Sequence, residues 1–101
     1  MFPVAYALEF NEAHTNVTRH LFFLYDDYEA LGLFNDALQR ALVNVRAFPE
    51  AYPRTGKAGR RFVFEFRSIP YVVPYAFDGE LVVLHDIHFA RSTQTAHWLS
   101  E

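Results

Sequence analysis

Residues 61–79 read RFVFEFRSIPYVVPYAFDG, and the alternation of large apolar residues in this stretch decides the fold. Phe62, Phe64 and Phe66 recur with a period of two, which is typical of a strand buried on one face. Ser68-Ile69-Pro70 interrupts the pattern, and a second strand is expected over 71–77. Pro74 lacks a ladder donor, so it predicts a bulge or an edge position in that second strand.

The dipeptide Asp78-Gly79 follows the second strand and suits the positive dihedral angles of a two-residue hairpin turn. We therefore expect 80–89 to form a partner strand. Pro49–Gly59, which contains Pro53 and two glycines, is expected to be the loop that leads into the first of these strands.

Upstream, the pattern changes from strand to helix. Residues 4–10 alternate and predict a first strand, and Asn11 is a candidate cap for the helix that follows. A helical period of apolar residues weakens at the acidic cluster around Asp26 and at Gly32, and then resumes as a second helix that ends before Pro49. Phe22 and Phe23 cannot both lie on the buried stripe, so at least one of them should be exposed and could mark an apolar groove for a partner helix.

The order of these elements predicts one α+β domain over residues 1–101. We expect an N-terminal strand, a two-helix hairpin, a three-stranded antiparallel meander and a short C-terminal helix over 92–101, with the helices packing on one small twisted sheet. About half of the residues are hydrophobic and 18% are aromatic, so a core can form without disulfide bonds. The chain has no cysteine that could form one.

Composition also restricts the function. The formal charge is -3, which argues against strong direct binding of nucleic acid by bulk electrostatics. No apolar run approaches the roughly 20 residues of a membrane span, and Met1-Phe2-Pro3-Val4 lacks the features of a signal peptide, so we expect a cytoplasmic protein without a membrane partner.

The basic residues are concentrated in one segment. Five of the nine lie within 54–67, where the only acid is Glu65; they are Arg54, Lys57, Arg60, Arg61 and Arg67. This segment predicts a basic patch that contacts phosphates or an acidic partner, with a solvated loop as the alternative.

The histidines support no metal site. His85 and His88 are three residues apart in one expected strand, so they point to opposite faces and cannot share an ion. His14 and His20 are expected at the surface. We predict neither a metal nor a cofactor.

His88, Arg91 and His97 are expected near one rim of the domain, where an arginine could hold a phosphate and a histidine could transfer a proton. That composition suits a metal-independent ribonuclease. The alternative is that His88 is a partly buried structural residue and His97 a terminal polar one, because no lysine or carboxylate completes the set.

The element order and several local strings resemble the RelE/ParE superfamily of toxins from type II toxin–antitoxin operons. The resemblance covers nearly the whole chain; its most specific parts are Phe48-Pro49, Gly59-Arg60-Arg61, Pro70–Tyr75 and Ile87–Arg91. It implies the fold described above and a cognate antitoxin as a partner.

The resemblance leaves two principal mechanisms open. In the RelE-like branch, ribosome-dependent cleavage of messenger RNA would use Arg91 at the strand end and His97 as acid or base. Val63, Glu65 and Val72 stand where that branch would place cations. The lack of cations at these three positions favours the ParE-like branch, whose members inhibit DNA gyrase by binding and have no catalytic residue.

For the ParE-like branch we expect Arg60, Arg61, Arg67, Arg91 and Trp98 to contact the antitoxin or the target, with antitoxin acids near the first three arginines. The ribosome is the alternative target. A third reading is a superfamily member that has lost toxicity and acts as an interaction module.

Overall fold

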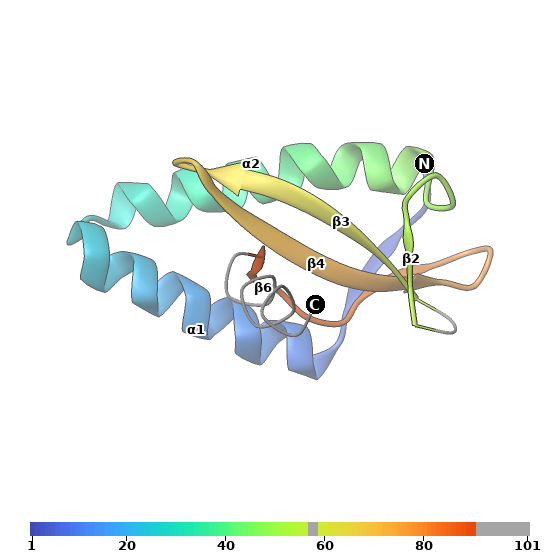
Figure 1. Cartoon of the computed structure of the whole chain (residues 1–101), viewed down its shortest axis with the longest axis horizontal. Helices are drawn as coiled ribbons and strands as arrows, with labels where there is room; N and C mark the ends of the chain where they lie inside the picture. The colour runs from blue at the N-terminus through green and yellow to red at the C-terminus, as the bar shows by residue number, and fades with distance from the viewer. Residues whose placement is uncertain (57–58, 91–101) are drawn as a thin grey trace, which may run out of the picture.

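A mixed sheet and two helices make up the fold in the computed structural model, which describes residues 1–56 and 59–90 (Figure 1). The α+β class predicted from the sequence is confirmed. In chain order the elements are β1 (Val4–Tyr6), α1 (Leu8–Tyr25), α2 (Tyr28–Ala47), β2 (Arg54–Thr55), β3 (Gly59–Phe66), β4 (Ile69–Phe77), β5 (Val82–Leu84) and β6 (His88–Phe89).

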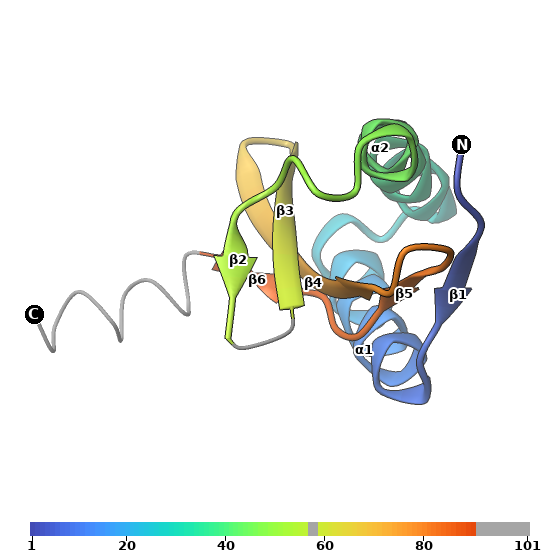
Figure 2. The same ribbon diagram turned by 90° about the vertical axis from the view of Figure 1, so that its right-hand side faces the viewer.

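The sheet order is β1-β5-β4-β3-β2, and β6 pairs with β4 beyond the end of β5. β1 runs parallel to β5, whereas every other pair is antiparallel. Figure 2 shows the helical hairpin on one side of β3 and β4, and within residues 1–56 and 59–90 no helix covers the opposite side. Neither helix is long and apolar enough to span a bilayer.

The first helix begins earlier than predicted. β1 ends at Tyr6, and Ala7 is the N-terminal cap of α1, so the strand expected over 4–10 is wrong in its second half. Asn11 is not the cap, because its N–H donates to the Ala7 carbonyl within the first turn (3.1 Å). Phe10 is buried at helical spacing with Val17 and Leu21, and this longer period outweighs the short alternation.

Two acids separate the helices. Asp26 adopts a left-handed conformation (φ 50°) and ends α1, and the Asp27 carboxylate accepts the Glu29 N–H (2.9 Å) and caps α2. Gly32 therefore lies inside α2. The second helix ends at Ala47, before Pro49, as predicted.

β3 and β4 form the longest hairpin of the sheet. Phe66 pairs with Ile69, so the turn consists of Arg67 and Ser68 alone, with φ angles of 53° and 67°. The interruption predicted over 68–70 is therefore shorter than expected, and β4 contains Pro70.

Pro74 lies in a central strand without a bulge, so the predicted bulge or edge position is wrong. Its register with Arg61 of β3 is continuous, and its carbonyl accepts the His85 N–H (2.9 Å). The N–H and C=O groups of a strand residue point toward the same neighbouring strand. The position at which Pro74 lacks an N–H therefore faces His85, where the chain passes from β5 to β6. The break between these strands accommodates the proline.

The second hairpin differs from its prediction in the turn and in the partner strand. Phe77 pairs with Val82, so the connection is the four-residue loop 78–81, in which the Asp78 carboxylate accepts the Glu80 and Leu81 N–H groups. The expected strand over 80–89 is divided into β5 and β6, and His85 lies outside both. β2 falls within the predicted loop at 49–59, and the helix predicted over 92–101 lies outside the described residues.

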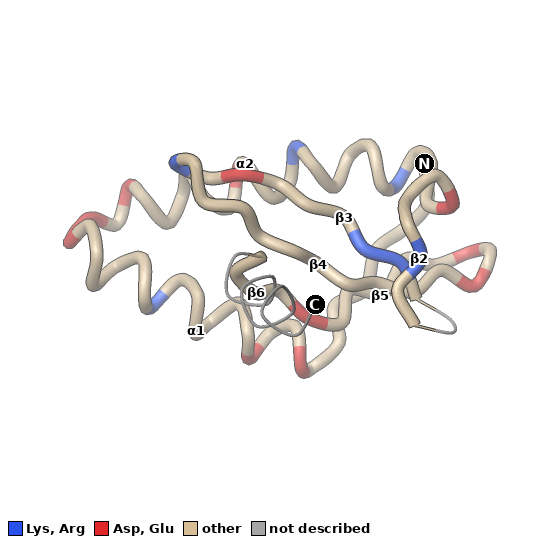
Figure 3. Tube along the Cα trace, in the orientation of Figure 1, with Lys and Arg blue, Asp and Glu red and all other residues tan. Residues whose placement is uncertain are grey.

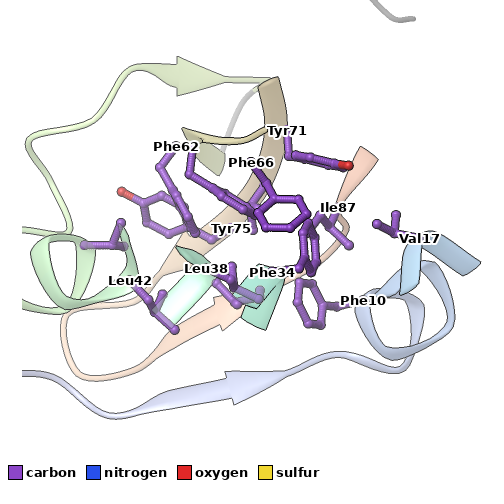
Figure 4. Close-up of a cluster of buried hydrophobic side chains, with 14 of the residues drawn as sticks. Phe10, Val17, Phe34, Leu38, Leu42, Phe62, Phe66, Tyr71, Tyr75 and Ile87 are labelled. Atoms are coloured by element: carbon purple, nitrogen blue, oxygen red, sulfur yellow. The ribbon is translucent and has the colours of Figure 1, made fainter. Parts of the chain in front are cut away.

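Aromatic rings fill the space between the helices and the sheet (Figure 4). The ring of Phe34 in α2 lies 5.5 Å from those of Phe64 and Phe66, and 5.0 Å from that of Tyr71. The prediction that Phe62, Phe64 and Phe66 form the core beneath the helices is confirmed. The remaining large core residues are Phe10, Val17, Leu21, Leu38, Leu42, Val45, Val73, Tyr75, Val82, Leu84 and Ile87.

Candidate functional site

The face of the sheet away from the helices, which we call the open face, is apolar at its centre. The register places Val63 of β3 opposite Val72 of β4, and Val72 opposite His88 of β6, so these three side chains form a row across the face. Val63 is 52% exposed, and Val72 and His88 are half-buried. A partner that covered this row would remove apolar surface from water, which favours association.

The rows on either side of this centre carry one charge each. Arg61 lies opposite Pro74, and Glu65 lies opposite Pro70. The positions where the resemblance would place nuclease cations, Val63, Glu65 and Val72, therefore all belong to the open face. Within the described part of this face, Arg61 at the β2 end carries the single guanidinium. One cation provides little positive charge to hold a phosphodiester.

The structure pairs Arg54 of β2 with Arg60 of β3, beside Arg61, and places Arg67 apart from them (Figure 3). Arg61 is exposed on the open face, whereas Arg60 points to the helix side and donates to the Tyr52 carbonyl (2.7 Å). Arg67 lies at the other end of β3, about 20 Å from Arg61 at about 3.3 Å per residue. The predicted basic patch is therefore divided, with Arg54, Arg60 and Arg61 at one end of β3 and Arg67 at the other.

Arg67 packs against the protein's own aromatic rings. Its guanidinium carbon lies 4.2 Å from the centre of the Tyr25 ring in α1 and 5.2 Å from that of Phe66. This stacking is favourable and joins the β3–β4 turn to the end of α1. Arg67 is therefore assigned a structural contact, in addition to the binding role predicted for it.

A carboxylate that sequence reasoning missed accompanies His88. Asp86 Oδ2 lies 3.5 Å from His88 Nδ1, and Asp86 Oδ1 accepts the Ile87 N–H (2.8 Å). The side chains of His88 and Asp86 are 34% and 49% exposed, so the pair is open to solvent at the edge of the apolar row. A carboxylate at Nδ1 orients an imidazole for proton transfer at Nε2.

The signal for this pair was the Asp-x-His spacing, because residues two apart in an extended chain share a face. The statement that no carboxylate completes the histidine set is therefore wrong. Arg91, His97 and Trp98, which were predicted to act beside His88 or on a partner, lie outside the described residues, as does Lys57.

His14 and His20 both lie on α1. His20 is exposed, as predicted, whereas His14 is half-buried with Nε2 2.7 Å from Asn35 Oδ1. His14 and Asn35 line a shallow pocket of about 220 Å³ with Tyr6, Phe10, Asn11, Leu38 and Gln39. None of these seven side chains is a lysine or arginine, so the pocket lining offers no permanent cation to hold a phosphate.

The tip of the helical hairpin also exposes aromatic residues. Phe23 is 78% exposed and Tyr28 76% exposed, and the ring of Tyr28 lies 4.6 Å from that of Phe22. The prediction that at least one of Phe22 and Phe23 is exposed is confirmed.

Comparison of the chain with models of known protein families and with curated protein sequences gave no match. Among the described residues, the open face combines the valines at 63 and 72, the contact between His88 and Asp86, and the charges of Arg61 and Glu65. These features make it the strongest candidate site in the part of the chain that the structure describes.

Proposed function

We propose that this protein is the toxin of a type II toxin–antitoxin pair, that it inhibits DNA gyrase by binding, and that an antitoxin encoded beside it neutralises it. The family resemblance supplies the operon context, and the open face supplies the support for binding over cleavage. The observation that carries this choice is the position of Val63, Glu65 and Val72 on that face, where two valines and an acid would meet the target.

An apolar row suits a protein partner better than an RNA backbone. Association with a protein gains from the burial of Val63 and Val72, whereas a phosphodiester would approach Glu65 against charge repulsion. The single guanidinium of Arg61 offsets little of that repulsion.

Two valines of similar exposure give a matched test of this proposal. Val63 on the open face is 52% exposed, and Val43 on α2 is 49% exposed. Induction of the wild-type chain in cells should arrest growth, and Val63→Glu should relieve the arrest, because it places a second carboxylate beside Glu65 on the face that binds. Val43→Glu should leave the arrest intact.

Thermal unfolding of both variants establishes that they fold. Relief of arrest by both substitutions, or by neither, would contradict a role for the open face. A wild-type chain that causes no arrest would favour a non-toxic interaction module.

The Asp86–His88 pair favours a second candidate, a ribosome-dependent endoribonuclease. In this reaction His88 Nε2 would take the proton from a ribose 2′-OH, whose oxygen attacks the phosphorus, while the leaving 5′-oxygen receives a proton from His97 and Arg91 holds the phosphate. This candidate predicts cleaved transcripts after induction, lost in His88→Gln, Arg91→Ala and His97→Ala. Intact transcripts in arrested cells would exclude it.

A further inference from the structure

The outer edge of β3 offers backbone groups that nothing pairs with in the described part of the chain. β2 covers only the first residues of β3, pairing Arg54 with Arg60 and Thr55 with Gly59. The Arg61 N–H then donates to the Pro53 carbonyl (3.1 Å). This bond shows that the backbone N–H and C=O groups of Arg61 point outward, away from β4. Since backbone direction alternates along a strand, the N–H and C=O groups of Val63 and Glu65 also point outward, away from β4.

An apolar strip of α2 lies beside this edge. Phe34 packs on Phe64 and Phe66 beneath β3, and Asn35 and Tyr28 mark the side of α2 that faces α1. The opposite side of the helix carries Leu33, Ala37 and Ala41, four residues apart and therefore in one stripe. Leu33 is 42% exposed, and the two alanines are half-buried against the core.

Figure 1 shows α2 running past the outer side of β3, with β4 and α1 on the other side. An additional strand beside β3 would therefore lie over this stripe of α2, and its inward side chains would pack on Leu33 and the two alanines. Its outward side chains would meet the open face beside Val63 and Glu65. An unpaired edge flanked by an apolar helix surface has the geometry of strand addition.

We propose that the antitoxin adds one extended strand to β3, antiparallel to it, over 62–66. This inference rests on the proposed function for the identity of the partner, and the chemistry of the strand comes from the edge itself. The strand carries apolar residues at alternate positions, which face α2, and a lysine or arginine opposite Glu65. Because Arg60 and Arg67 point away from this surface, the strand needs no acids opposite these two residues, in contrast to the prediction from the sequence. Arg61 lies on the open face, one residue before the paired span.

Hydrogen exchange tests the proposal directly, with the full-length chain measured alone and in complex with the antitoxin encoded beside it. The amides of Val63 and Glu65 should exchange rapidly in the free protein and at least a hundredfold more slowly in the complex. Phe62 and Phe64, whose amides point to β4, serve as internal controls because they are paired in both states.

The outcomes separate the two proposals. If the antitoxin binds while the Val63 and Glu65 amides exchange equally fast in both states, strand addition is wrong and the proposed function stands. If the antitoxin does not bind at all, the proposed function fails with it. Protection already present in the free chain would show that another part of the chain or a second copy occupies the edge, which also overturns the inference.

A substitution at Val63 gives an independent measurement of affinity. Val63→Pro removes an outward N–H and leaves the β3–β4 ladder its donors, so it should weaken antitoxin binding at least tenfold. Val63→Thr keeps the amide and the branched side chain and should change affinity less than twofold. If Val63→Pro does not fold, Glu65→Lys replaces it, and it should weaken binding about fivefold by placing like charges together, with Glu65→Gln as the milder control.

Discussion

Tyr71 and Tyr75 lie four residues apart on the buried face of β4, and their hydroxyls have opposite surroundings. The Tyr75 hydroxyl donates to the Pro49 carbonyl, whereas the Tyr71 hydroxyl has no partner among the described residues. Tyr75→Phe should lower the free energy of unfolding by about 1–2 kcal/mol, because it leaves a buried carbonyl unpaired. Tyr71→Phe should leave stability unchanged or raise it.

Urea unfolding of the two variants at neutral pH makes this comparison, since each removes one hydroxyl from the same strand. Equal losses of stability would contradict the contrast between the two hydroxyls.

The same residues predict a loss of stability in alkali. Burial raises the pKa of both Tyr71 and Tyr75 to about 12, above the ordinary value of 10.0. The unfolded chain therefore loses these protons first, so the stabilisation is complete below pH 10 and is lost as pH rises towards 12. Each tyrosine should contribute a slope of about 1.4 kcal/mol per pH unit in this window.

Urea unfolding at several pH values between 9 and 12 measures the slope, and Tyr71→Phe should halve the tyrosine contribution. A slope unaffected by this substitution would show that Tyr71 ionises equally easily in the folded and unfolded chains.

At the scale of elements, the β3–β4 turn carries strain that a glycine would relieve. Ser68 has a φ of 67°, a conformation that costs a residue with a side chain about 1 kcal/mol. Ser68→Gly should therefore raise the free energy of unfolding by about 0.5–1 kcal/mol. Ser68→Ala, which removes the hydroxyl and keeps Cβ, is the control and should give no gain; thermal unfolding that ranks alanine above glycine would contradict this account.

The sequence predicted those elements whose periodicity is long or strict. The strand at Phe62–Phe66 and the end of the second helix before Pro49 were predicted because their patterns have one interpretation. The boundaries at 4–10 and 80–89 were wrong for two physical reasons. For 4–10, a short alternation of apolar residues also fits the first turn of a helix. For 80–89, Pro74 in the central strand β4 interrupts the strand that pairs with it.

At the scale of the whole molecule, the prediction of the site depended on tertiary placement. The centre of the open face was predictable, because Val63 and Glu65 alternate with the buried phenylalanines. The separation of Arg60 from Arg67 was not, since clustering along the chain says nothing of the two ends and two faces of a strand. The Asp86–His88 contact was available from spacing and was overlooked.

These observations meet at the open face, because no helix of the described residues covers this side of β3 and β4 and the sequence places valines, few cations and an acid there. That combination underlies the central claim that the protein acts on its target by binding.

A DNA gyrase supercoiling assay with the purified protein tests this claim most directly. The account predicts that the wild-type chain and Val43→Glu inhibit supercoiling and accumulate cleaved DNA, and that Val63→Glu does neither. Unaffected gyrase, together with cleavage of ribosome-bound messenger RNA by the same preparation, would contradict it.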